Sequence, residues 1–263
     1  MGHVRTLALG VLSAALAGPA ARAGEAEEFR WQGKIARGLA IEVKGVNGEI
    51  EATAASGGQA EVVAVKKGRR SNPADVEIKV VEHAGGVTVC AVYPSPPGEA
   101  PNECRPGKGG RMNARDNDVQ AHFTIRIPSG VRFVGRTVNG GIEAASLDAD
   151  AEAYTVNGSV HVSARGHVRA ETVNGSITAS LGRADWTGAL DFKTVNGSIT
   201  VGLPEGTSAD VHAATVNGEI ETDFGLTVRG RFSRRRLSGT IGGGGRELNL
   251  ETVNGSIRLR RSS

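Results

Sequence analysis

One short motif recurs through the second half of the chain. Thr-Val-Asn-Gly, followed by a variable residue and then Ile or Val, occurs six times, and successive copies are 17 to 22 residues apart except for a final gap of 37. Periods near 20 residues are typical of solenoids, in which each repeat forms one rung and buries its apolar face only against its neighbours. The asparagines of the six copies are Asn139, Asn157, Asn174, Asn196, Asn217 and Asn254.

Two weaker copies extend the array. An earlier "GVNGEIEA" supplies a further corner at Asn47. Within the 37-residue gap, Ser238–Ile241 ("SGTI") stands where Asn-Gly-Ser-Ile stands in the other copies. It divides the gap into two ordinary periods, so we expect a degenerate rung there.

Residues on both sides of each Asn-Gly alternate between apolar and polar. Leu190 and Phe192 precede one corner, and Ile199 and Val201 follow it, each pair separated by a polar residue. Such a period of two predicts strands with one buried face. The parity shifts by one across Val-Asn-Gly, so either the Thr or the Val of each motif turns inward, and the sequence leaves this choice open.

Asn-Gly between two strands has two interpretations. It is the usual signal of a two-residue hairpin, which would give a meander. It also suits a solenoid corner, where Asn and Gly accept positive φ at low cost and Asn amides stack from rung to rung. The solenoid is favoured, because independent hairpins would not need the same motif at every period.

The fold expected is therefore all-β. We predict a right-handed, single-stranded β-solenoid of β-helix-like repeats over residues 131–263, and a less regular β N-terminal part over residues 24–130 that joins the same sheet system. Aromatic residues make up only 4% of the chain, so the core must be thin and filled by small or branched side chains.

The first 23 residues predict export. Arg5 provides a basic start, an apolar run follows, and Ala21-Arg22-Ala23 ends it, as in a secretory signal peptide. The apolar run is too short for a membrane span, and we expect no transmembrane segment. The expected location is the periplasm, the cell surface or the medium.

Removal of residues 1–23 leaves 29 basic and 28 acidic side chains, a net charge of +1. A general polyanion-binding protein carries a clearer excess of positive charge, so no specific nucleic-acid partner is expected.

The two cysteines, Cys90 and Cys104, enclose a loop rich in Pro and Gly. An even cysteine count in an exported chain favours a disulfide, and in the chain-entropy model a loop this short gains about 3 kcal/mol from one.

The signal peptide, the Ile-Pro-x-Gly that leads into the first regular copy, and the serial "TVNGSI" corners resemble the bacterial putative-adhesin family of unknown function. The resemblance implies a β-solenoid domain of the cell envelope. It supplies no catalytic residues to transfer to this sequence.

Motifs that carry chemistry are sparse. "RPGKGG" lacks the spacing and following helix of a phosphate-binding loop, and no His, Cys or carboxylate spacing predicts a metal site. Glu219, Glu221 and Glu143 are the acids considered for glycan cleavage, which needs two carboxylates about 5–10 Å apart. We predict no catalytic, cofactor-binding or metal-binding residues. The expected function is non-catalytic binding or structure, and the alternative is a polysaccharide-processing β-solenoid enzyme.

Basic residues cluster near the end of the chain. They predict either a cationic surface that contacts an anionic partner or charges that protect a strand edge, and edge protection is favoured. The partner is expected to be an envelope component, whether protein, glycan or anionic lipid surface. The residues are Arg229, Arg231, Arg234, Arg235, Arg236, Arg258, Arg260 and Arg261.

Overall fold

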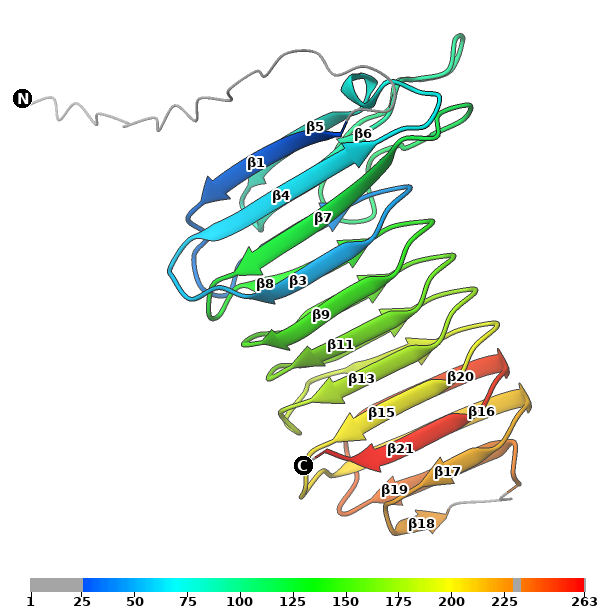
Figure 1. Ribbon diagram of the computed structural model, residues 1–263. Helices are drawn as coiled ribbons and strands as arrows, with labels where there is room; N and C mark the ends of the chain where they lie inside the picture. The colour runs from blue at the N-terminus through cyan, green and yellow to red at the C-terminus, as the bar shows by residue number, and fades with distance from the viewer. Residues whose placement is uncertain (1–25, 229–232, 263) are drawn as a thin grey trace, which may run out of the picture.

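The computed structural model describes residues 26–228 and 233–262, which form two long β-sheets stacked face to face along one axis (Figure 1). The predicted signal peptide and two of the predicted arginines, Arg229 and Arg231, lie outside these residues. Within the described part of the chain the one helical turn is a short 3-10 helix, Pro73–Asp75. The chain is thus nearly all β, as predicted.

The first sheet has ten strands. In spatial order they are β1 (Glu27–Gly33), β4 (Ala60–Lys67), β7 (Gln120–Ile127), β3 (Ile50–Ala54), β9 (Ile142–Leu147), β11 (Val160–Ala164), β13 (Ile177–Leu181), β15 (Ile199–Leu203), β21 (Ile257–Arg261) and β17 (Ile220–Thr222).

The second sheet has eleven strands. In spatial order they are β18 (Leu226–Val228), β19 (Arg236–Ile241), β16 (Ala209–Asn217), β20 (Glu247–Asn254), β14 (Ala189–Lys193), β12 (Val168–Glu171), β10 (Ala151–Tyr154), β8 (Arg132–Arg136), β2 (Ala40–Lys44), β6 (Gly86–Val92) and β5 (Glu77–His83).

Successive repeats pair in parallel, which is the solenoid arrangement and excludes the hairpin meander. β9, β11 and β13 pair in parallel in the first sheet, and β8, β10 and β12 do so in the second. The rung formed by β2 and β3 stacks directly on the rung of β8 and β9, although it belongs to the N-terminal part. Both sheets therefore run through the whole described chain.

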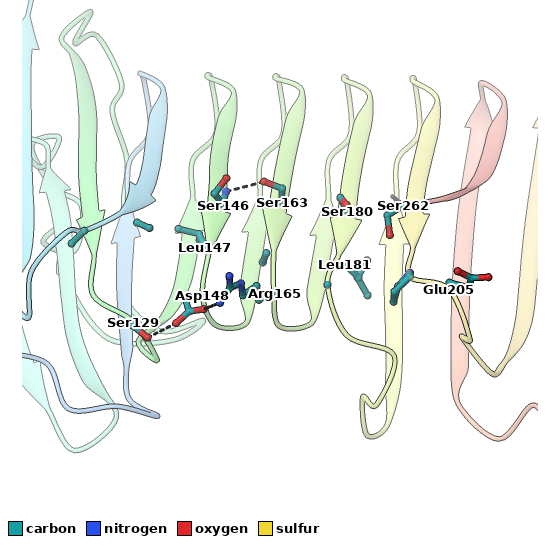
Figure 2. A pocket seen from close by; sticks show the side chains of 15 residues that line it. Ser129, Ser146, Leu147, Asp148, Ser163, Arg165, Ser180, Leu181, Glu205 and Ser262 are labelled. Carbon is teal, nitrogen blue, oxygen red and sulfur yellow. Dashed lines mark hydrogen bonds and ion pairs between the residues drawn. The ribbon is translucent and has the colours of Figure 1, made fainter.

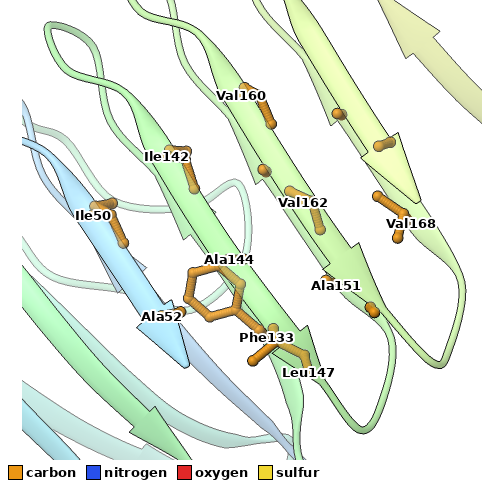
Figure 3. Packing of buried hydrophobic residues seen from close by; sticks show 14 of the residues in the cluster. Ile50, Ala52, Phe133, Ile142, Ala144, Leu147, Ala151, Val160, Val162 and Val168 are labelled. Carbon is orange, nitrogen blue, oxygen red and sulfur yellow. The ribbon is translucent and has the colours of Figure 1, made fainter. Parts of the chain in front are cut away.

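The core is a set of stacked columns between the two sheets (Figure 3). One column takes the same strand position from six neighbouring rungs, and each of its residues is at most 1% exposed. Small side chains such as Ala52, Ala144 and Ala151 leave room for the few large ones, including Phe133. The column consists of Ile50, Ile142, Val160, Ile177, Ile199 and Ile257.

The order of the rungs in space differs from their order in the chain. β21 lies between β15 and β17, and β20 lies between β14 and β16 (Figure 1). The last repeat of the sequence is therefore not the last rung of the stack. It fills a position between two rungs that precede it in the chain.

The prediction of a degenerate rung at Ser238–Ile241 is wrong. These residues belong to β19, which pairs antiparallel with β16 and adds no corner to the stack. A rung needs a pair of strands with a corner between them, and this segment supplies one strand. The 37-residue gap arises because β18 and β19 cap the stack before the chain returns to insert its last repeat.

Antiparallel strands cap both ends. β1 and β4 extend the first sheet beyond β7, and β5 extends the second sheet beyond β6. At the other end β19 and β18 cover β16, while the outermost strands β17 and β18 have three residues each. Short edge strands limit pairing with other chains.

Candidate functional site

The asparagines of the motif form one continuous ladder along the corner. Each side-chain Nδ2 donates to the Oδ1 of the asparagine on the neighbouring rung, at 2.7–2.8 Å. In spatial order the ladder is Asn47, Asn139, Asn157, Asn174, Asn196, Asn254 and Asn217.

The threonine of each motif points inward, which answers the question that parity left open. These threonines are only 5–7% exposed. Each hydroxyl donates to the carbonyl oxygen of the motif glycine on the neighbouring rung, as Thr155 does to Gly140 at 2.8 Å and Thr194 to Gly175 at 2.9 Å. The buried hydroxyl is thereby satisfied at the corner.

The motif glycines are required by close stacking, and the positive φ expected for the Asn-Gly pair is mostly absent. No motif asparagine has positive φ, and most motif glycines do not have it either. A Cβ placed on Gly197 would instead lie 2.0 Å from the carbonyl oxygen of Gly175, and one on Gly175 would lie 2.0 Å from that of Gly158. Only glycine allows this approach between rungs.

The valine of each motif points outward. Val138, Val156, Val173, Val195 and Val253 are 38–40% exposed and line the corner in a single ridge. With the inward Thr, the Asn ladder, the close-packed Gly and the buried Ile, the ridge completes a structural account of the repeat. The repeated motif thus serves the corner, and we sought binding chemistry on other surfaces.

A hollow lined by polar side chains lies at the opposite end of the strands of the first sheet (Figure 2). It is an open trough of about 890 Å³. It crosses six neighbouring strands from β3 to β21, which at about 4.8 Å per rung is a length of about 24 Å. We call it the serine trough. Its polar and charged lining residues are Ser129, Ser146, Asp148, Ser163, Arg165, Ser180, Glu205 and Ser262.

A row of hydroxyl groups runs along the serine trough. Ser146, Ser163 and Ser180 lie side by side on the successive strands β9, β11 and β13, and Ser262, which follows the end of β21, lies beyond Ser180 along the trough (Figure 2). Ser163 and Ser180 occupy the same register position, and Ser163 Oγ accepts from the N–H of Ser146 at 2.8 Å. The floor beneath them is apolar, because Leu147 and Leu181 are buried there.

The charges at one end of the trough are internally balanced. Asp148 accepts hydrogen bonds from the hydroxyl of Ser129 and from Arg165, the latter at 3.1 Å. The Ser129 hydroxyl, with Arg165 as a further cause, lowers the pKa of the Asp148 carboxyl. Glu205 stands at the other end (Figure 2). The trough can therefore exchange hydrogen bonds with a ligand without selecting strongly for ligand charge.

Sequence reasoning missed the serine trough. Ser163 and Ser180 each follow the motif asparagine by six residues, so an alignment of the repeats could have revealed the row. Ser146 departs from this spacing because β9 carries a register shift against β11, where Ser146 adopts a φ of 54°.

The acids considered for glycan cleavage do not come together. Glu143 on β9 and Glu221 on β17 are five rungs apart, about 24 Å. Glu221 accepts from Arg260 at 2.8 Å, and Glu219 pairs with Arg234 at 3.3 Å. Catalytic carboxylates lie about 5–10 Å apart, so Glu143 does not pair with the other two, and Glu219 and Glu221 are each held in an ion pair with an arginine.

The predicted arginines lie on different elements and are partly neutralised. Arg258 and Arg260 of β21 sit one rung inside the end of the first sheet and pair with Glu221, and Arg260 also pairs with Asp223. Arg261 stacks on the ring of Phe224. Contact with an anionic partner through the remaining cations, Arg235 and Arg236, stays a prediction.

The predicted disulfide is present and anchors a loop over the second sheet. Cys90 of β6 is bonded to Cys104 with a Cα–Cα distance of 5.7 Å. Beneath the loop, the buried carboxylate of Glu42 accepts from Arg136 at 3.0 Å and from Thr88 at 3.1 Å. Sequence reasoning missed this network, because its members lie on strands far apart in the chain.

The described residues contain no group of three or more His, Cys, Asp or Glu side chains arranged to hold a metal ion. His167, for example, lies between two carboxylates, 3.5 Å from Asp150 and 3.4 Å from Asp185. In the same described part of the chain, no helix has the length and apolar character to cross a membrane.

The fold and the trough define the class: a two-sheet β-solenoid whose repeat is structural and which carries a trough lined by hydroxyl groups. Residues 136–260 match the family model described as Toastrack DUF4097. This stretch thus carries the domain of a putative-adhesin family of unknown function, and the resemblance drawn from the sequence is confirmed there.

Three solved structures are similar to the chain at low identity. A putative cell adhesion protein from Clostridium sporogenes is 14% identical, with a TM-score of 0.47, covering 90% of this chain and all of that one. A putative adhesin from Bacteroides fragilis is 12% identical, with a TM-score of 0.29, covering 89% and 97%. One from Parabacteroides merdae is 11% identical, with a TM-score of 0.25, covering 91% and 99%. Among curated proteins, none matches the chain.

Proposed function

We propose that the protein is an exported, non-catalytic, adhesin-like β-solenoid that binds an extended polar polymer of the cell envelope along the serine trough. The observation that carries this proposal is the row of hydroxyl groups on successive rungs, Ser146, Ser163 and Ser180. The same polar group recurs at the rung spacing, which suits a ligand that also repeats along its length.

The chemistry of the trough favours a neutral glycan as that polymer. A serine hydroxyl both donates and accepts hydrogen bonds, as sugar hydroxyls do. Asp148 is neutralised by Arg165, so a strongly charged ligand gains little there. The apolar floor of Leu147 and Leu181 suits the C–H faces of sugar rings.

Export is supported by the disulfide and by the N-terminal sequence. Cys90–Cys104 requires an oxidising compartment to form and persist, which fits an extracellular or surface protein. Residues 1–23 have the three parts of a secretory signal peptide.

The test is binding of the mature chain to purified envelope polysaccharides by calorimetry, beside a turnover assay on the same materials. The variant S163Y/S180Y fills the trough, and K193Y places the same ring on the outer face of the second sheet as its control. We expect S163Y/S180Y to weaken binding at least about tenfold, the loss of one to two hydrogen bonds, and K193Y to leave it unchanged. Turnover lost on changing Glu219 or Glu221 would instead establish the enzyme.

A further inference from the structure

The Gly-rich segment 105–111, "RPGKGGR", is held rigidly against the second sheet; we call it the Lys44 loop. The ammonium of Lys44 donates to the carbonyl oxygens of Arg105 and Gly107, both at 2.5 Å, and of Gly109 at 3.0 Å. The N–H of Gly107 donates to Glu42 at 2.8 Å, and the disulfide fixes the adjoining residue Cys104. The loop is therefore shaped before any ligand arrives.

This anchoring fixes the direction of two backbone N–H groups. The chain has no cis peptide bonds in its described part. In a trans peptide the carbonyl and the N–H of the next residue point in opposite directions. Since the carbonyls of Gly107 and Gly109 point at Lys44, the N–H groups of Lys108 and Gly110 point away from it.

Those two N–H groups are free to bind a ligand. Neither meets an acceptor among the residues that the structure describes. Gly107 and Gly110 adopt φ of 68° and 88°, a backbone form that other residues avoid. The two N–H groups are two residues apart on the side of the loop that faces away from Lys44, and backbone N–H groups gathered in this way by a turn form an anion-binding concavity.

Among the described residues around the loop, one cationic side chain has no ion-pair partner. A groove of about 380 Å³ separates the loop from the strands β8, β10 and β12. Of its lining cations, Lys44 and Arg136 are paired with Glu42, and Arg111 is paired with Glu99. The ammonium of Lys108 has no ion-pair partner within the described chain.

The rest of the groove wall is mixed in character. The Arg136 guanidinium lies over the ring of Tyr154, 4.1 Å from the ring centroid. Tyr154, the exposed Val138 and Met112 form the apolar part of the groove wall. Glu171 and Glu103 also line the groove, and Glu103 is paired with Arg105. The groove can thus hold an uncharged, partly apolar body, while its anionic group is bound at the loop.

We propose that the Lys44 loop binds an oxyanion, a carboxylate or phosphate carried by a glycan, through the N–H groups of Lys108 and Gly110 and the Lys108 ammonium. The oxyanion follows from the loop geometry alone. The glycan as its carrier rests on the proposed function. The site lies on the opposite sheet from the serine trough, so each can be tested without the other.

The experiment measures binding of three hexamers to the mature, disulfide-bonded protein by calorimetry at low and high salt. The probes are a uronic acid hexamer, a glycerol-phosphate hexamer and a neutral glucose hexamer. The variants are K108Q, which removes only the exposed charge, K193Q as the matched control lysine on the same sheet, and S163Y/S180Y for the trough. Thermal midpoints of all variants establish that they are folded.

We expect at least one acidic hexamer to bind, with K108Q about tenfold weaker, as for loss of one charge-assisted hydrogen bond, and K193Q unchanged. Which acidic hexamer binds identifies the source of the oxyanion. The inference is overturned if neither acidic hexamer binds, or if K108Q binds them as the wild type does. If binding of the acidic hexamers is lost only in S163Y/S180Y, the result supports the proposed function and contradicts this inference. If binding of the acidic hexamers is lost only in K108Q and no glycan binds in the trough, the result supports this inference and contradicts the proposed function.

Discussion

Asn254 donates its side-chain N–H to Asn196 at 2.7 Å, although 58 residues separate them in the chain. Asn217, which stands between them in sequence, donates to Asn254 from the far side at 2.8 Å. The last repeat is therefore inserted between two earlier ones. Every rung beyond β15 depends on this insertion, because β16 and β17 reach the stack through β20 and β21.

The inserted rung should be essential for stability. Leu250 is fully buried in β20, and truncation to Ala should cost about 2–5 kcal/mol of the free energy of unfolding, from lost burial and the cavity left behind. Val253, three residues away and 39% exposed, serves as the control and should lose less than about 1 kcal/mol. Urea unfolding measures both, and equal losses would contradict the insertion.

The asparagine ladder predicts that an Asn→Ala substitution lowers the free energy of unfolding more in the middle of the ladder than at its end. Asn196 donates to Asn174 and accepts from Asn254, whereas Asn217 is the end of the ladder and makes only one such bond. Replacement of Asn196 by Ala should cost about 2 kcal/mol, and of Asn217 about 1 kcal/mol, at about 1 kcal/mol per hydrogen bond. Denaturation midpoints that do not distinguish the two variants would argue against the ladder.

The stacked glycines predict a steric cost that is independent of φ. Gly197→Ala places a Cβ 2.0 Å from the carbonyl oxygen of Gly175, so neighbouring rungs must separate. We expect a loss of at least about 3 kcal/mol. Gly57→Ala meets no atom within 4 Å and is the control. If both variants unfold at the wild-type midpoint, close stacking does not explain the motif glycine.

The acid dependence of stability should include a contribution from Asp118. Hydrogen bonds from the backbone N–H groups of Ser71 and Arg70 lower the pKa of this carboxyl to about 2. A folded-state pKa below the usual value near 4 means that the contribution is present above about pH 4 and is lost as the pH falls toward 2. Asp118→Asn should flatten the decline of the unfolding midpoint in that window, and an unaltered decline would contradict this assignment.

The periodicity in the sequence predicted the solenoid, its corners and the thin core, because alternation and stacking are properties of each repeat taken alone. It could not order the rungs. All copies carry the same corner, so Asn254 fits beside Asn196 as well as Asn217 does, and the choice depends on how the 37-residue gap folds. Parity also left the inward Thr open, since only the stacked carbonyls of the neighbouring rung decide it.

The binding surfaces were harder to predict for a related reason. Ser163 and Ser180 meet because their rungs are neighbours, and each serine taken alone gives no signal, so that only an alignment of the repeats places them in one row. Lys44 meets the carbonyl of Gly107 across 63 residues, through a loop whose path depends on the disulfide. The explanation of Asn-Gly by positive φ was wrong for most corners because it considered one corner by itself, without the rung stacked on it.

The central claim is that the repeat maintains the fold while the serine trough binds the ligand, and one comparison tests it directly. The affinity of N196A and of S163Y/S180Y for an envelope polysaccharide that binds the wild type should be measured by calorimetry below their unfolding temperatures. We predict wild-type affinity for N196A, despite its lower stability, and at least about tenfold weaker binding for folded S163Y/S180Y. The opposite pattern, with binding lost in folded N196A and kept in S163Y/S180Y, would contradict it.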